Sequence, residues 1–87
     1  MSNHNTIEQE LKRKFEEVFR ENLHKVQFIA RHYLKDFDAS KDVAQEVFST
    51  LWQKRQEINF SRPILPYLSV LTKNRCLNIL KNQKIQP

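Results

Sequence analysis

Residues 42–53 read DVAQEVFSTLWQ, and this stretch decides the fold class. When its residues are placed at 100° steps, one side of the resulting helix is apolar: Val43, Ala44, Val47, Phe48, Leu51 and Trp52. The opposite side is continuously polar: Asp42, Glu46, Ser49 and Gln53. An amphipathic helix buries its apolar side against other elements, so the stretch predicts one member of an all-α domain.

The preceding segment predicts a long amphipathic helix. It begins near Thr6, where Asn5 with Glu8 or Thr6 with Gln9 could form a capping box. It continues as one helix, or as two with a bend near residues 22–24. Its apolar stripe is Ile7, Leu11, Phe15, Val18, Phe19, Leu23, Val26, Ile29, Ala30, Tyr33 and Leu34.

The helix that carries residues 42–53 has two candidate N-caps, Asp38 and Ser40, whose side-chain oxygens can accept a hydrogen bond from the first turn. It is expected to fray around Gln56. Helical spacing lapses over residues 57–65, which predicts a loop.

A third helix is expected from Pro66 to about Gln83, because proline fits the first turn of a helix. One side holds Leu68, Leu71, Thr72, Arg75, Cys76 and Ile79. Arg75 must be paired or reach solvent, since an unpaired buried charge is costly, and Asp42 or Glu46 is a candidate partner. The other side could lie on nucleic acid or partly pack on the first helix: Tyr67, Val70, Lys73, Asn74, Leu77 and Lys81.

Length and composition indicate a single domain of three to four helices. The chain has 87 residues, is 39% hydrophobic and contains no glycine, which excludes glycine-rich phosphate loops and EF-hand calcium loops. A lone Cys76, no signal peptide and no apolar run near the roughly 20 residues of a membrane span predict a cytoplasmic protein without membrane insertion.

Charge is distributed unevenly along the chain. Residues 1–57 hold ten Lys or Arg and ten Asp or Glu, whereas residues 58–87 hold five Lys or Arg and no acid. A basic segment without acids attracts a phosphate backbone, although a soluble basic surface has the same composition.

Little in the sequence indicates catalysis. His4, His24 and His32 lack the spacing of zinc ligands, and Cys76 has no second thiol nearby. The carboxylates that occur close together fit a turn or a solvated helix face. We therefore expect a protein that is not an enzyme and has no metal or cofactor, and whose chemistry is recognition.

Several segments share one resemblance. They are Asp42-Val43-Ala44-Gln45-Glu46-Val47-Phe48 with Leu51-Trp52, the upstream Phe15 to Phe19 and Tyr33-Leu34-Lys35-Asp36, and the later Tyr67-Leu68 and Asn74-Arg75. In this order and spacing the chain resembles region 2 of bacterial sigma factors, in the iron-uptake-regulator-like branch of the extracytoplasmic-function (ECF) group, over residues 15–82.

The resemblance implies two partners in transcription initiation. In the family, the polar face of the Asp-x-x-Gln-Glu helix docks on the clamp helices of the RNA polymerase β′ subunit. The matching residues are Asp42, Gln45, Glu46, Ser49 and Gln53. Carboxylates and amides suit an arginine-bearing partner, although an ordinary solvated helix face has the same composition.

The second partner is promoter DNA. In the family, the loop and third helix bind the non-template strand of the minus-ten element and hold a base out of the stack. The matching residues are Phe60, Ser61, Arg62, Tyr67, Lys73, Asn74 and Arg75. Cations neutralise phosphates, aromatic rings stack on bases and an amide can read a base edge. Phe60 and Tyr67 could instead pack in the core, and Arg75 could be structural.

The sequence departs from the family around the aromatic-Leu pair and at its own end. Leu65 and Pro66 replace the small or polar residues usual just before this pair, Pro63 adds a second rigid point, and Tyr67 stands where many members have Trp. The family continues into a helix-turn-helix domain that is absent here. We expect residues 1–5 to be a flexible N-terminus, 6–83 the region 2 domain and 84–87 the start of an interdomain linker. On this view, the chain is part of a longer protein or cannot position itself on a full promoter.

Two other functions fit the sequence less well. A helical protein interaction domain would use its basic end for solubility only. A double-stranded DNA regulator of the helix-turn-helix type conflicts with the long segment at residues 56–66, because such motifs turn within 3 to 4 residues. The resemblance also predicts an anti-sigma factor as a controlling partner.

Overall fold

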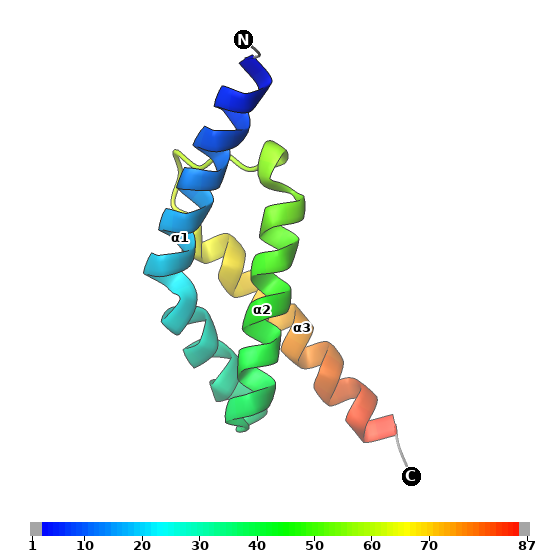
Figure 1. The fold of residues 1–87 in the computed structure, drawn as a ribbon. Coiled ribbons are helices and arrows are strands. Elements are labelled where there is room, and N and C mark those ends of the chain that lie inside the picture. Colours follow the sequence, from blue (N-terminus) through cyan, green and yellow to red (C-terminus); the bar gives the residue numbers. More distant parts are fainter. Residues whose placement is uncertain (1–2, 86–87) are drawn as a thin grey trace.

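The computed structural model describes residues 3–85, with the side chains of residues 6–83, and this part of the chain forms helices and no strand (Figure 1). The elements are α1 (Asn3–Leu34), α2 (Phe37–Gln53), the short 3-10 helix η1 (Arg55–Glu57) and α3 (Leu65–Ile85). The prediction of an all-α fold is confirmed. Residues 1–2 and 86–87, at the predicted flexible end and linker, lie outside the described part.

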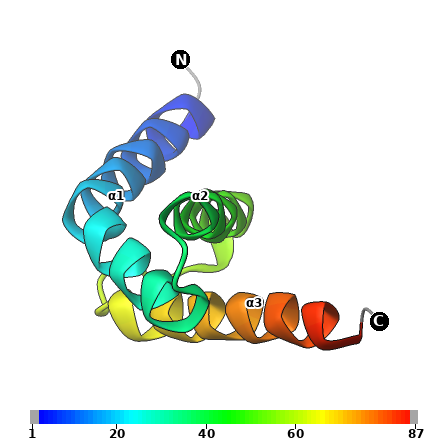
Figure 2. The same ribbon diagram turned by 90° about the horizontal axis from the view of Figure 1, so that it is seen from below.

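α1 is one uninterrupted helix that changes direction in the cyan part of the chain (Figures 1 and 2). There the side-chain amide of Asn22 donates a hydrogen bond of 2.8 Å to the carbonyl of Val18, one turn earlier. A side chain that bonds into the carbonyl ladder is a known cause of helix bending. Of the two alternatives left open by the sequence, the single helix is correct, and it bends within the range 22–24 that the other alternative named. Beyond it, α1 reaches α3, where the Cys76 sulfur lies 4.0 Å from the carbonyl oxygen of Ala30.

The start of α1 differs from the prediction. α1 begins at Asn3 instead of near Thr6, so residues 5 and 6 occupy helical positions and neither predicted capping box is correct. Glu8 instead accepts hydrogen bonds from Arg55, at 3.3 and 3.2 Å, and from the amide of Gln56 at 3.1 Å. A tertiary contact has replaced the local one.

The turn between α1 and α2 consists of Lys35 and Asp36. Lys35 has a positive φ of 59°, and its N–H donates to the carbonyl of Arg31 at 2.9 Å, which closes the end of α1. Asp36 is the N-cap of α2, because its carboxylate accepts from the N–H of Ala39 at 3.0 Å. The predicted caps at Asp38 and Ser40 are therefore wrong. The fully buried Ser40 hydroxyl donates to the Asp36 carbonyl at 2.6 Å, within the first turn.

The core lies where α2 packs against both other helices. Figure 2 looks along α2 and shows α1 and α3 on two of its sides. The buried apolar residues come from all three helices and the loop: Val26, Ala30, Val43, Ala44, Val47, Phe48, Leu51, Ile64, Leu68 and Cys76. Thr72 is also fully buried, and its hydroxyl donates to the Leu68 carbonyl at 2.6 Å. The predicted apolar side of residues 42–53 thus forms the centre of the fold.

The predicted loop is confirmed as the irregular segment 58–64 that follows η1. It turns at Asn59, whose side-chain oxygen accepts from the N–H of Ser61 at 3.0 Å and whose carbonyl accepts from the N–H of Arg62 at 3.1 Å. Ile64 enters the core just before α3 begins, and Pro66 lies in the first turn of α3 as predicted. This anchoring fixes where α3 crosses α1 and α2.

Candidate functional site

The polar face of α2 is exposed over its whole length. All five residues that the resemblance assigns to polymerase docking are exposed: Asp42, Gln45, Glu46, Ser49 and Gln53. The helix backbone beneath this face is held in place because the other side of the same helix is buried, from Val43 to Leu51. Polymerase docking by these five residues is a prediction, and we refer to them below as the docking face.

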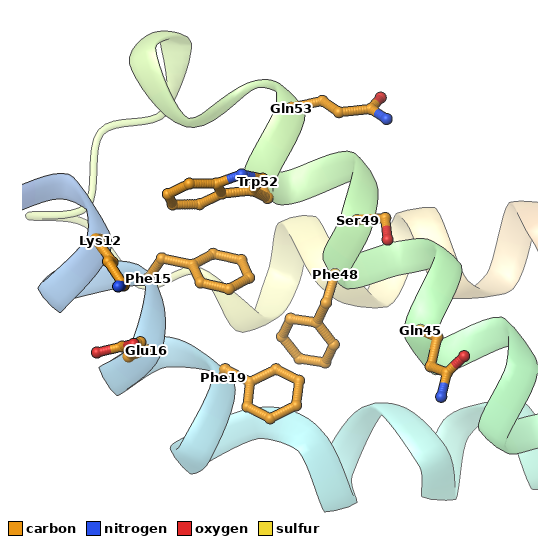
Figure 3. Close-up of a pocket in the computed structure, with 9 residues that line it drawn as sticks. All are labelled: Lys12, Phe15, Glu16, Phe19, Gln45, Phe48, Ser49, Trp52 and Gln53. Carbon is orange, nitrogen blue, oxygen red and sulfur yellow. The ribbon is translucent and has the colours of Figure 1, made fainter. Parts of the chain in front are cut away.

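An aromatic groove runs beside the docking face, between α1 and α2 (Figure 3). Its volume is about 590 Å³, and four rings line it: Phe15, Phe19, Phe48 and Trp52. The Trp52 and Phe15 ring centroids are 5.0 Å apart, as are those of Phe19 and Phe48, and both pairs are edge-to-face. The sequence assigned Phe15 and Phe19 to an apolar stripe, which predicts burial. The structure leaves Phe19 36% exposed, so the groove was missed.

An ion pair connects the docking face to α3. The Arg75 Nε donates to both carboxylate oxygens of Glu46 at 3.1 Å. The sequence required Arg75 to be paired or to reach solvent, with Asp42 or Glu46 as the candidate partner. In the structure Arg75 is paired with Glu46 and is also partly exposed. Asn74 and Asn78 line the same shallow cleft between α2 and α3. One residue assigned to polymerase and one assigned to DNA are therefore bonded to each other.

The residues assigned to DNA divide into an exposed group and a packed group. Ser61, Arg62, Lys73 and Asn74 are exposed. Phe60 and Tyr67 are half-buried and pack against the core, so the alternative interpretation of these two as packing residues holds in this structure.

The same residues also lie in two separate places. Phe60 and Ser61 line a depression with residues of the first turns of α1, from Thr6 to Lys14. Asn74 and Arg75 instead line the cleft against α2. The fold thus groups Lys73, Asn74 and Arg75 on α3 but does not gather all seven residues into one depression.

The outer side of α3 is basic and open to solvent. Val70 and Leu77 are 56% and 43% exposed, whereas Tyr67 on the same side is half-buried and packs against the core. The later turns of this side are therefore open to solvent, and packing of the side is limited to its start. Lys73 and Lys81 are exposed beside Val70 and Leu77, and residues 58–83 contain no carboxylate. This surface can attract phosphates without competing internal ion pairs.

Cys76 lies on the inner side of α3 and is fully buried. Burial raises the pKa of its thiol, and the nearby Arg75 opposes this effect only in part. A buried thiol with a raised pKa is a poor nucleophile, in line with its interpretation as a core residue.

Within residues 3–85, no three His, Cys, Asp or Glu side chains are grouped so that they could hold a metal ion. In the same part of the chain, no helix has the length and apolar character needed to cross a membrane.

Comparison with known proteins decides the family. The model of the family described as "Sigma-70 region 2" matches residues 18–85, well over half of the chain. The chain belongs to the sigma-70 region 2 family. The match covers α2, the loop, α3 and most of α1, so this sigma region 2 domain contains both the docking face and the basic side of α3. Membership of the ECF group stays a prediction.

A relative supports the same family assignment. The domain is 32% identical over 59 residues to the "Probable RNA polymerase sigma factor RfaY" of Xanthomonas campestris pv. campestris. The match covers 68% of this chain but only 15% of that protein. No solved structure matches the chain.

Proposed function

We propose that this sigma region 2 domain serves transcription initiation by docking on the β′ clamp helices of RNA polymerase through the docking face. The observation that carries the proposal is the exposed row of carboxylates and amides on a helix whose other side is locked in the core. Carboxylates accept paired hydrogen bonds from arginine, which fix orientation as well as affinity. The buried side fixes the helix backbone, so little backbone ordering opposes binding.

The second part of the proposal is capture of the non-template strand of the minus-ten element. In this proposal Arg62 and Lys73 neutralise phosphates and the Asn74 amide reads a base edge, which their exposure supports. Phe60 and Tyr67 shape the loop and the start of α3, because they pack against the core. Melting needs no ATP in this scheme, since binding of unpaired bases offsets the few kcal/mol of unstacking.

The polymerase arm is tested by calorimetric titration of the 87-residue chain with a β′ clamp-helix fragment. Asp42→Asn removes one carboxylate from the docking face, and we expect it to weaken binding about fivefold to tenfold. Asp42 is a better probe than Glu46, because loss of Glu46 also frees Arg75. The charge-matched control is Glu21→Gln, an exposed carboxylate on α1. Absence of binding by the folded parent chain would contradict the proposal.

The DNA arm is tested by fluorescence anisotropy with single-stranded oligonucleotides that carry a minus-ten sequence or a scrambled one, in the presence of the clamp fragment. Loss of one base-reading amide is worth about 1–3 kcal/mol of discrimination, so Asn74→Ala should reduce the preference for the promoter strand about 5- to 150-fold. Asn82→Ala changes an exposed amide farther along α3 and serves as the control. Equal binding of both strands by the parent chain would favour a helical interaction domain without a DNA role.

An anti-sigma factor remains a predicted partner. If it controls the domain by blocking polymerase, it must cover the docking face. A competition titration between the two partners tests this prediction directly, since independent binding of both would contradict it.

A further inference from the structure

One carboxylate in the first turns of α1 fastens the 3-10 helix η1 to that helix. The Glu8 Oε1 atom accepts hydrogen bonds from the Nε and Nη2 atoms of Arg55, at 3.3 and 3.2 Å. Its Oε2 atom accepts from the side-chain amide of Gln56 at 3.1 Å. Arg55 and Gln56 are consecutive residues of η1, so both oxygens of Glu8 are engaged across the contact between α1 and η1. We refer to Glu8, Arg55 and Gln56 as the clasp.

The central residue of the clasp is also held from its other side. The Arg55 Nη1 atom donates to the carbonyl of Trp52 at 2.9 Å, and the guanidinium carbon lies 4.1 Å from the Trp52 ring centroid. The Arg55 side chain is only 24% exposed, less than the arginines of the other ion pairs. A planar guanidinium that is bonded at its edge and stacked on its face has little freedom to move. The clasp therefore fixes η1 relative to both α1 and the end of α2.

The loop 58–64 follows the clasp directly and lies on the same part of α1. Residues 58–61 line a depression whose other side consists of α1 residues between Thr6 and Lys14. Figure 1 shows this loop, drawn in yellow, beside the blue part of α1. The first turns of α1 thus support the loop in two ways, through the clasp and through the depression.

This support comes from a part of α1 that the family match does not include. The match begins at residue 18, so it contains η1 and the loop but not Glu8. The loop carries Ser61 and Arg62, which are exposed and which the proposed function assigns to the promoter strand. An irregular loop that has to be ordered during binding weakens binding, whereas a loop that is already held does not.

We propose that the clasp holds the loop in the conformation that captures the minus-ten strand, with Glu8 as a positioning residue. This inference rests on the DNA arm of the proposed function and extends it to the first turns of α1. The Glu8 side chain is 42% exposed, so its ion pair adds little to the stability of the whole domain. Loss of Glu8 should therefore loosen η1 and the loop while the core of the three helices stays folded. A positioning role then appears as lost strand selectivity without an equal loss of stability.

The test compares Glu8→Ala with Glu17→Ala in the 87-residue chain. Glu17 is the matched control, because it is an exposed carboxylate of α1 whose partner, Arg13, lies on the same helix. Alanine is compatible with a helix at both positions. Both variants lose one negative charge, so an effect of net charge on strand binding is the same in both.

The first measurement is hydrogen exchange of four backbone amides that donate hydrogen bonds within η1 and the loop: Glu57, Ile58, Ser61 and Arg62. Glu8→Ala should speed their exchange about fivefold and leave the core amides of α2 unchanged. The second measurement is the preference for a minus-ten strand over a scrambled strand, by fluorescence anisotropy in the presence of the clamp fragment. This preference should fall about threefold to tenfold, the effect of ordering one or two side chains during binding. The calorimetric affinity for the clamp fragment should not change, and the control variant should alter none of these quantities.

The outcomes separate this inference from the proposed function. If the parent chain shows no preference for the minus-ten strand, the DNA arm is wrong and the positioning role is wrong with it. If the parent chain shows the preference and Glu8→Ala retains it, the DNA arm stands and this inference is wrong, whatever the exchange rates. Unchanged exchange of the four amides would also overturn the inference. If circular dichroism shows that Glu8→Ala is unfolded, the same two measurements on Glu8→Asp decide, because this variant keeps the charge but is one methylene shorter and should lose part of the clasp.

Discussion

The ion pair between Glu46 and Arg75 predicts a small, salt-dependent coupling between α2 and α3. The Arg75 Nε bonds both carboxylate oxygens at 3.1 Å, which is favourable geometry. The Arg75 side chain is 39% exposed and the Glu46 side chain 50%, so water screens most of the attraction. Exposed pairs of this kind contribute about 0.2–1 kcal/mol, and we expect about 0.5 kcal/mol at low ionic strength.

The assay is a double-mutant cycle with Glu46→Gln, Arg75→Gln and the combined variant. In a domain of this size, 0.5 kcal/mol corresponds to about 2–4 °C in Tm. Urea unfolding at low salt should give this coupling energy, and about 0.5 M NaCl should reduce it markedly. The control is a second cycle that combines Glu46→Gln with Lys73→Gln, and it should give no coupling energy. A coupling near zero at low salt, or above about 1.5 kcal/mol, would refute the reasoning.

The variant Glu46→Gln should weaken polymerase binding but strengthen DNA binding. Glu46→Gln removes a docking carboxylate, so it should weaken binding to the clamp fragment. It also frees Arg75, which can then contact a phosphate. The dependence of strand binding on the logarithm of salt concentration should steepen by about 0.7, the contribution of one additional phosphate contact on a single strand. An unchanged slope would mean that Arg75 remains structural.

Three further predictions concern stability. Lys35→Gly should raise the free energy of unfolding by about 0.5–1 kcal/mol in urea titrations, because Lys35 has a φ of 59° that costs a residue with a Cβ atom more than glycine. Arg55→Ala should lower the free energy of unfolding by about 1–2 kcal/mol, since the guanidinium stacks 4.1 Å from the Trp52 ring centroid and bonds Glu8. Arg55→Lys should retain less than half of this stabilisation, because an ammonium group lacks the planar fork of arginine. Burial raises the pKa of Cys76 in the folded state, so its neutral thiol contributes to the free energy of unfolding below the ordinary thiol pKa. This contribution is lost as the pH rises through 9 and above, and Cys76→Ala should therefore show a smaller decrease of stability in this range.

Most of the architecture follows from local spacing. The apolar side of residues 42–53 predicted the buried side of α2, and Pro66 marked the first turn of α3. The position of Arg75 in an apolar stripe indicated that it is paired or reaches solvent, and both hold, because it bonds Glu46 and is partly exposed. Errors arose where several residues could make the same local bond. Asp36, Asp38 and Ser40 can all cap a helix, and the path of the chain after Lys35 selected the first.

The candidate site was also predicted only in part. The sequence predicted which residues of α2 face solvent, because one helix carries them all. The sequence did not predict the aromatic groove, since the groove depends on the distance between α1 and α2 and on which rings lie between them. The separation of Phe60 from Asn74 was also unreadable, because it depends on where α3 crosses the other helices.

The sequence by itself determined an all-α domain of three to four helices, their apolar sides, the polar side of α2 and the basic end of the chain, because these depend on periodicity and on charge counted along a single element. Only the tertiary structure decided that Glu8 bonds Arg55, that Glu46 and not Asp42 bonds Arg75, and that Phe19 stays partly exposed beside Trp52. Each of these is a relation between two helices. The bend of α1 and the crossing of α3 fix such distances, and local spacing does not contain them.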